Sequence, residues 1–147
     1  LMPDELLDSI STAGREMQWR GMLGGTPPRS QILVAEGEDE RLLGFCHCGP
    51  GRDDDIDQFD VGEIYALYVA PDDWRAGIGS ELMRRSVDFL EAADYELISL
   101  WVLETNRRAR DFYEVAGFIP DGTQKTEERL GHTLEEVRYR CALLVEE

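Results

Sequence analysis

The chain has 147 residues, 42% hydrophobic and 31% charged, which is the length and composition of one globular domain. Its 31 acidic and 15 basic residues give a formal net charge of −16. This charge disfavours binding to nucleic acid or to an anionic membrane, and a cationic partner is easier to accommodate. The sequence shows neither an apolar run of the roughly 18 residues that a membrane span needs nor a signal-peptide pattern.

In chain order, apolar spacing predicts short helices over residues 3–10 and 14–23. Strands over residues 32–35 and 42–48 flank a turn and predict a hairpin. An acidic loop is expected over residues 49–62. Residues 63–69 then form a strand so apolar that we expect burial on both faces.

A loop over residues 71–80 precedes an amphipathic helix that is expected to end near Ala93. A strand over residues 97–103 follows, and then a helix over 106–116 with Gly117 at the expected C-terminal cap. A short strand begins at Phe118, and the last strand covers residues 135–144. This order mixes an antiparallel meander with two strand-helix-strand crossovers, which indicates the α+β or mixed α/β class.

The most informative segment is the loop that ends in Gly77-Ile78-Gly79-Ser80, directly before a helix. Glycines at a helix N-terminus let unpaired N–H groups approach a pyrophosphate. A dinucleotide-binding fingerprint would need a small residue where Leu82 stands, and a Walker A loop would need a lysine that the loop lacks. A plain glycine-rich turn fits this segment, taken alone, equally well.

Three segments in this order and spacing resemble the GNAT superfamily of N-acetyltransferases: EIYALYV at residues 63–69, WRAGIGS at 74–80 and NRRARDFYEVAGF at 106–118. The resemblance covers about residues 32–144. It implies a GNAT-like acyl-CoA N-acyltransferase fold, a single domain whose central mixed, mostly antiparallel sheet is flanked by helices. Family members usually begin with a further strand and helix, so we expect this sequence to lack both.

The resemblance implies that acetyl-CoA is the co-substrate and that its acetyl group passes to a primary amine by direct attack on the thioester. The peptide N–H near Val69 is the expected oxyanion donor, at a place where the family's sheet splays. Trp74 stands where the family usually has Gln or Arg, which backbone binding tolerates. The implied cofactor-binding residues are Leu67, Tyr68, Val69, Trp74, Arg75, Ala76, Gly77, Ile78, Gly79, Ser80 and Asn106.

Tyr113 is the expected general acid, because a phenol stays protonated at neutral pH and can donate to the leaving thiolate. Its place on the apolar stripe of its helix fits a core residue as well. Glu63 heads the central strand and is the expected base, directly or through water, although a solvent-facing strand residue fits nearly as well. Arg107, Arg108 and Arg110 either meet the cofactor's phosphates or form a solvated face.

Three cysteines, two of them in the stretch Cys46-His47-Cys48, do not form a disulfide framework and predict a reducing compartment, the cytoplasm. Strand alternation sends His47 to the face opposite both neighbours, so we expect no metal site.

The acceptor is expected to be a small-molecule or protein amine. The acidic residues from Asp53 to Asp60 either attract a cationic acceptor or only keep the protein soluble. A non-catalytic CoA-binding sensor or interaction module of the same fold is the alternative function. Dimers are common among the proteins that the chain resembles, so a homodimer is a further expectation.

Overall fold

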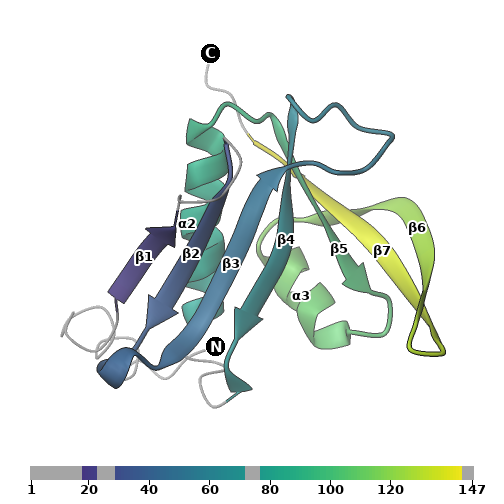
Figure 1. The fold of residues 1–147 in the computed structure, drawn as a ribbon. Helices are drawn as coiled ribbons and strands as arrows, with labels where there is room; N and C mark the ends of the chain where they lie inside the picture. Colours follow the sequence, from purple (N-terminus) through teal and green to yellow (C-terminus); the bar gives the residue numbers. More distant parts are fainter. Residues whose placement is uncertain (1–17, 23–28, 72–76, 144–147) are drawn as a thin grey trace.

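The computed structural model describes residues 18–22, 29–71 and 77–143, which form one seven-stranded mixed sheet with helices packed against it (Figure 1). The strand order is β1-β2-β3-β4-β5-β7-β6, in which the β4–β5 pair is parallel and the other pairs are antiparallel. The predicted α+β class is therefore confirmed. The elements are β1 (Gln18–Met22), β2 (Gln31–Glu36), the 3₁₀ turn η1 (Glu38–Glu40), β3 (Leu42–Pro50), β4 (Val61–Val69), α2 (Ile78–Ala92), β5 (Leu97–Leu103), α3 (Arg107–Val115), β6 (Ile119–Arg129) and β7 (His132–Ala142).

The helix predicted over residues 14–23 is wrong for its second half, because Gln18–Met22 forms strand β1. This strand pairs antiparallel with β2, from Gln18 opposite Glu36 to Met22 opposite Ile32. An isolated helix of about ten residues is marginal in water, whereas the edge of β2 offers a row of backbone partners. The helix predicted over residues 3–10 lies outside the described residues.

The last two strands form a longer hairpin than the sequence predicts. The segment expected to be a short strand from Phe118 extends as β6 to Arg129, and β7 begins at His132 rather than at Glu135. Residues 121–129 are polar and carry no apolar alternation, so their strand character comes from pairing with β7. Gly131, with a φ of 80°, lies at the turn between the two strands.

Both helices, α2 and α3, cover the same face of the sheet, which is the far face in Figure 1. Leu82 and Leu90 of α2 are fully buried in one cluster with Ile98 and Leu100 of β5 and Tyr139 of β7. The predicted cap residue Gly117 follows α3 with a φ of 103°. Neither described helix is long and apolar enough to cross a membrane.

Candidate functional site

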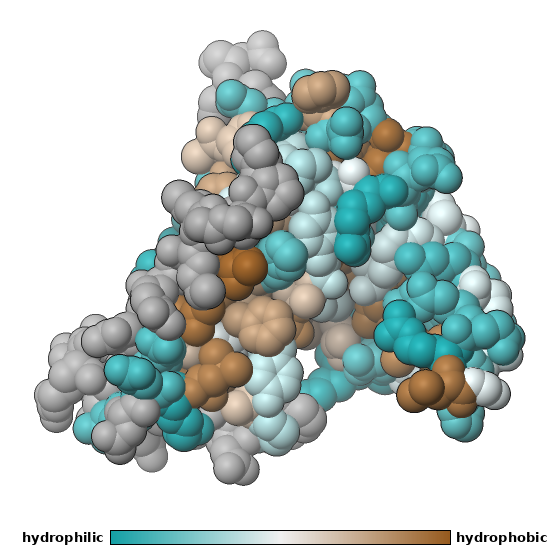
Figure 2. Space-filling model, viewed as in Figure 1, coloured by the Kyte–Doolittle hydropathy of each residue, from teal (hydrophilic) through white to brown (hydrophobic). Residues whose placement is uncertain are grey.

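The parallel strands β4 and β5 form a fork. They pair from Val61 opposite Leu97 to Ile64 opposite Leu100, and β4 then continues to Val69 without further pairing to β5 in the described part of the sheet. Figure 1 shows the two strands diverging, with α3 behind them. Figure 2, from the same side, shows the surface hollowed at this place.

A β-bulge lies on β4 where the fork begins. The β3–β4 register runs from His47 opposite Ala66 to Cys48 opposite Ile64, so Tyr65 is the extra residue. One extra residue reverses the alternation of side chains. Ile64 faces the helices before the bulge, and Leu67 packs against the same core after it.

The peptide groups beyond the bulge are turned toward the open side of the fork. The N–H of Ala70 donates to the carbonyl of Leu43 on β3 at 2.8 Å. Because peptide groups alternate in direction along a strand, those of Leu67 and Val69 point away from β3 and toward the β5 side. An added extended chain would need this orientation of the peptide groups in order to pair with β4. Tyr68, between these two residues, is 41% exposed.

The start of α2 lies beside the end of β4. Gly77 precedes the helix in the left-handed conformation, with a φ of 75°, and Ile78 is buried. A Cβ added at Gly79 would lie 3.4 Å from Val69 and 3.6 Å from the ring of Phe112, so Gly79 lies against both the strand and α3. Ser80 is exposed. The predicted cofactor residues Trp74, Arg75 and Ala76 lie outside the described residues.

A pocket of about 900 Å³ opens between the N-terminal half of α2 and α3. Gly77, Gly79 and Ser80, at the N-terminus of α2, line one end of the pocket, and apolar side chains line the rest of it. Two arginines and two aspartates line it as well, and Arg84 among them is paired with Glu81 and Asp88 on its own helix. The lining residues are Gly77, Gly79, Ser80, Met83, Arg84, Val87, Asp88, Arg108, Asp111, Phe112, Val115 and Ala116.

Tyr113, the expected acid, is buried on the core side of α3. Its ring centroid lies 5.5 Å from that of Phe112 and 6.1 Å from that of Phe118. Burial, with a smaller contribution from Cys46, raises the pKa of the phenol to about 12. Among the described residues, the Tyr113 hydroxyl is not one of the buried polar atoms left without a hydrogen-bond partner.

Glu63, the expected base, is buried with only 3% of its side chain exposed, on the sheet face opposite the helices. The backbone N–H of Arg52 donates to Glu63 Oε1 at 2.9 Å, and Arg52 Nη2 donates to Oε2 at 3.1 Å. The guanidinium of Arg52 also lies 4.0 Å from the ring centroid of Tyr65. Arg52 therefore holds both carboxylate oxygens at the base of the fork.

Asn106 caps α3, because its side-chain oxygen accepts a hydrogen bond from the N–H of Ala109 at 3.1 Å. Arg110 forms hydrogen bonds within the fold: its Nε donates to the hydroxyl of Tyr139 at 2.9 Å and its Nη1 donates to the carbonyl of Glu104. Of the three arginines expected near phosphates, only Arg108 lines the pocket.

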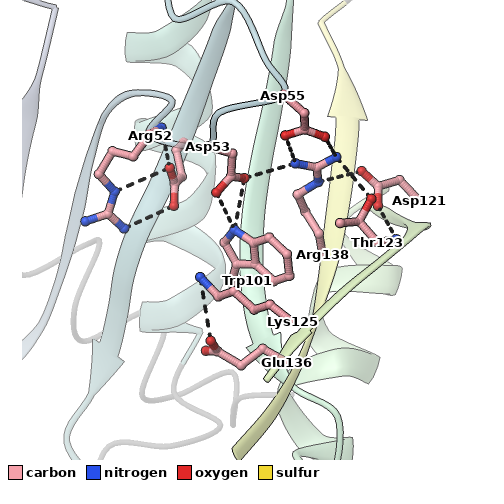
Figure 3. A network of polar contacts seen from close by, with 10 residues as sticks. Arg52, Asp53, Asp55, Trp101, Asp121, Thr123, Lys125, Glu136 and Arg138 are labelled. Atoms are coloured by element: carbon pink, nitrogen blue, oxygen red, sulfur yellow. Dashed lines mark hydrogen bonds and ion pairs between the residues drawn. The ribbon is translucent and has the colours of Figure 1, made fainter. Parts of the chain in front are cut away.

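Two residues of the acidic loop, Asp53 and Asp55, are bound within the fold. Arg138 of β7 donates to Asp53 at 3.0 Å and to Asp55 at 2.8 Å (Figure 3). The same guanidinium donates to Asp121 of β6 at 2.7 Å. Sequence reasoning missed this cluster, because Asp53 and Arg138 are 85 positions apart and carry no local pattern.

The Cys46-His47-Cys48 stretch lies on β3 as the alternation predicts. Both thiols are buried, and burial raises their pKa values to about 11 for Cys46 and about 12 for Cys48. His47 is on the other face, with its ring edge on Tyr65 at a centroid distance of 4.8 Å. Within the described residues, no group of three side chains is arranged to hold a metal ion.

The pocket-lining role of four apolar residues was also missed by sequence reasoning. Met83 and Val87 lie on the apolar side of α2, and Phe112 lies on α3. Val115 at the end of α3 is 85% exposed and lines the pocket. An exposed valine of this kind is an apolar contribution to the pocket surface that no motif in the sequence indicates.

Comparisons with known proteins agree with this geometry. The family model described as the acetyltransferase (GNAT) family matches residues 4–118. An uncharacterised N-acetyltransferase of Bacillus subtilis, YuaI, is 28% identical over 130 residues, which span 80% of this chain and 70% of that protein. An uncharacterised N-acetyltransferase of Archaeoglobus fulgidus is 35% identical over 82 residues, but these cover only 56% of this chain and 55% of that protein.

Among solved structures, a GNAT family acetyltransferase from Elizabethkingia anophelis with acetyl-CoA bound superposes with a TM-score of 0.65 at 14% identity, covering 87% of this chain and 99% of that one. At this identity the likeness shows the fold. Together with the match of the family model over more than half of the sequence, it agrees with the forked sheet and the glycine-led helix. The chain belongs to the acetyltransferase (GNAT) family.

Proposed function

We propose that this chain transfers the acetyl group of acetyl-CoA to a primary amine of a small molecule or a protein. The observation that carries the proposal is the fork between β4 and β5, which opens beside the pocket at the start of α2. The pantetheine arm pairs with the peptide groups of Leu67 and Val69 as an added strand, beside Tyr68. The pyrophosphate lies at the backbone of residues 74–80, and Asn106 approaches the arm from the cap of α3.

In the reaction, the amine nitrogen attacks the thioester carbonyl carbon, the C–N bond forms and the C–S bond breaks. The N–H of Val69 stabilises the oxyanion. Tyr113 donates to the leaving sulfur, and a pKa of about 12 keeps its proton in place at neutral pH. Because that value exceeds the pKa of about 8.5 of a free thiol, the phenol stabilises the thiolate mainly by a hydrogen bond.

Glu63 accepts the proton of the acceptor through water rather than by direct contact. Arg52 covers both of its oxygens, and little of the side chain is open to a bulky substrate. The acceptor is cationic, in keeping with a net charge of −16. The free thiols Cys46, Cys48 and Cys141 suit a reducing compartment, and we place the reaction in the cytoplasm.

Calorimetric titration with CoA, ATP and NAD tests the binding step. We expect heat of binding with CoA only, and binding of NAD or ATP in its place would refute the proposal. Release of thiol from acetyl-CoA in the presence of a panel of primary amines then tests transfer. Binding without turnover across the panel would favour the alternative, a CoA-binding module.

The role of Tyr113 is tested by Tyr113→Phe, with Tyr95→Phe as the matched control. Tyr95 is also buried, but its hydroxyl donates to the carbonyl of Arg29, away from the fork. We expect Tyr113→Phe to lower kcat by about 10²-fold or more and to leave CoA affinity unchanged. An equal kcat in the two variants would remove Tyr113 from the mechanism.

A further inference from the structure

Trp101 lies at the mouth of the fork, on the face of the sheet opposite the CoA pocket. It directly follows Leu100, the last residue of β5 that pairs with β4. Leu100 is buried against the helices, so the alternation of β5 turns the indole of Trp101 to the other face, where it is half-buried. Glu63 lies on that same face, because it is paired with Ser99, two positions before Trp101.

The indole is held in one orientation by a chain of ionic contacts. Trp101 Nε1 donates to both oxygens of Asp53, at 3.1 and 3.0 Å. Asp53 is bound by Arg138, which Asp121 and Asp55 hold in turn (Figure 3). A ring fixed in this way is a pre-organised surface for a ligand.

An ammonium group already occupies this surface. Lys125 Nζ lies 4.2 Å from the centroid of the Trp101 ring and 3.7 Å from Glu136 Oε1. The side chain of Lys125 is 40% exposed and that of Glu136 is 20% exposed, so both are reachable from solvent. The cluster contains four carboxylates (Asp53, Asp55, Asp121 and Glu136) against two cations (Arg138 and Lys125), which leaves two negative charges and favours a further cation.

We propose that Trp101 and Glu136 form an acceptor subsite for an ammonium group, and that Lys125 fills this subsite in the free protein as an intramolecular competitor. A cation–π contact and a carboxylate stabilise the protonated amine, which works against the proton loss that attack requires. The subsite therefore binds a second cation of the acceptor, and the acceptor class is a diamine or another amine that carries a separate positive group. This assignment of the acceptor depends on the proposed transferase function, whereas binding at Trp101 does not.

Binding is measured first, without turnover. The ¹H–¹⁵N signal of the Trp101 indole, assigned by its loss in Trp101→Leu, is followed during titration with 1,4-diaminobutane and with 1-butanol as the uncharged control. We expect the diamine alone to shift the signal, and Lys125→Met to lower the apparent Kd about 3- to 10-fold. Arg129→Met is the matched control, because it removes an exposed β6 cation whose ion pair among the described residues is with Glu127, and it should leave the Kd unchanged.

Turnover is measured next, with n-butylamine against α,ω-diamines of increasing length. We expect Lys125→Met to lower KM for diamines and not for n-butylamine, and Glu136→Gln to raise it for diamines, with kcat little changed in each case. If the diamine does not shift the Trp101 indole signal in either wild type or Lys125→Met, the proposed subsite is refuted. A diamine that binds at Trp101 in a protein without acetyl transfer would support the subsite and refute the transferase function instead.

Discussion

Arg138 joins three segments of the chain, and its replacement by methionine is the most informative change to the fold. Its guanidinium contacts Asp53 and Asp55 in the loop after β3 and Asp121 in β6. Methionine keeps much of the apolar stem and removes the charge. The variant leaves Asp121, whose side chain is 7% exposed, as a buried carboxylate without its cation.

The cost follows from the burial of each pair. Side-chain exposures of 8% for Arg138 and 7% for Asp121 place this pair in the class whose disruption costs about 3–5 kcal/mol. The pair with Asp55, whose side chain is 58% exposed, adds little. For a chain of 147 residues, a loss of this size lowers Tm by about 10–16 °C.

Urea unfolding measured by circular dichroism gives the free energy of unfolding of wild type and Arg138→Met. Arg129→Met is the control, because its partner Glu127 lies at 2.9 Å but the two side chains are 67% and 41% exposed. We expect a loss of about 1 kcal/mol or less for the control. Adding Asp121→Leu to Arg138→Met should recover part of the loss. Equal losses for Arg138→Met and Arg129→Met would refute the reasoning from burial.

Three further predictions concern the cap, the loop and pH. Asn106→Ala should cost about 1 kcal/mol in the free energy of unfolding, and an unchanged urea midpoint would contradict the cap. Gly77→Ala strains a φ of 75° and should weaken CoA binding in calorimetry more than Gly122→Ala, a surface glycine with a φ of 88°. Hydrogen bonding to Arg138 lowers the pKa of Asp55. For Asp121, burial opposes this effect, but bonds from Thr123 and Arg138 still lower its pKa. The stabilisation of the folded state by these two carboxylates is therefore complete above about pH 4 and is lost as the pH falls further. A urea midpoint of wild type that falls with acidification no faster than that of Arg138→Met would refute this prediction.

Much of the fold was predictable because its central elements carry strong periodic patterns. The helix after Asn106 has the apolar spacing of one helix face, whereas residues 97–103 form an apolar run of strand length, and the structure has β5 at Leu97–Leu103 and α3 at Arg107–Val115. β1 and β6 lack such patterns. Their strand character comes from backbone pairing with a neighbour, which no local window of sequence contains.

The site was predictable to the extent that backbone geometry defines it. Gly77 and Gly79 indicated the start of a helix, and α2 begins directly after Gly77, with Gly79 lying against β4 and α3. That this helix start binds a pyrophosphate stays a prediction. The cluster around Arg138 joins residues 17 to 85 positions apart, and the contact between Lys125 and Trp101 also connects two different strands. Such contacts depend on strand order, which was not derivable from spacing.

The bulge at Tyr65 exists because β4 has one residue more than β3 at this point. The direction of β4 beyond the bulge therefore depends on the number of residues there and not on which residue is the extra one. Exchanging the tyrosine for another side chain leaves the count intact, so the strand beyond should keep its heading. Deleting one residue between Gly62 and Ala66 would instead invert every later position of β4, exposing the leucine and valine that now contact the core. Insertions and deletions at this point are therefore far more damaging to the chain than substitutions, and length is the quantity that evolution or an engineer must hold constant there.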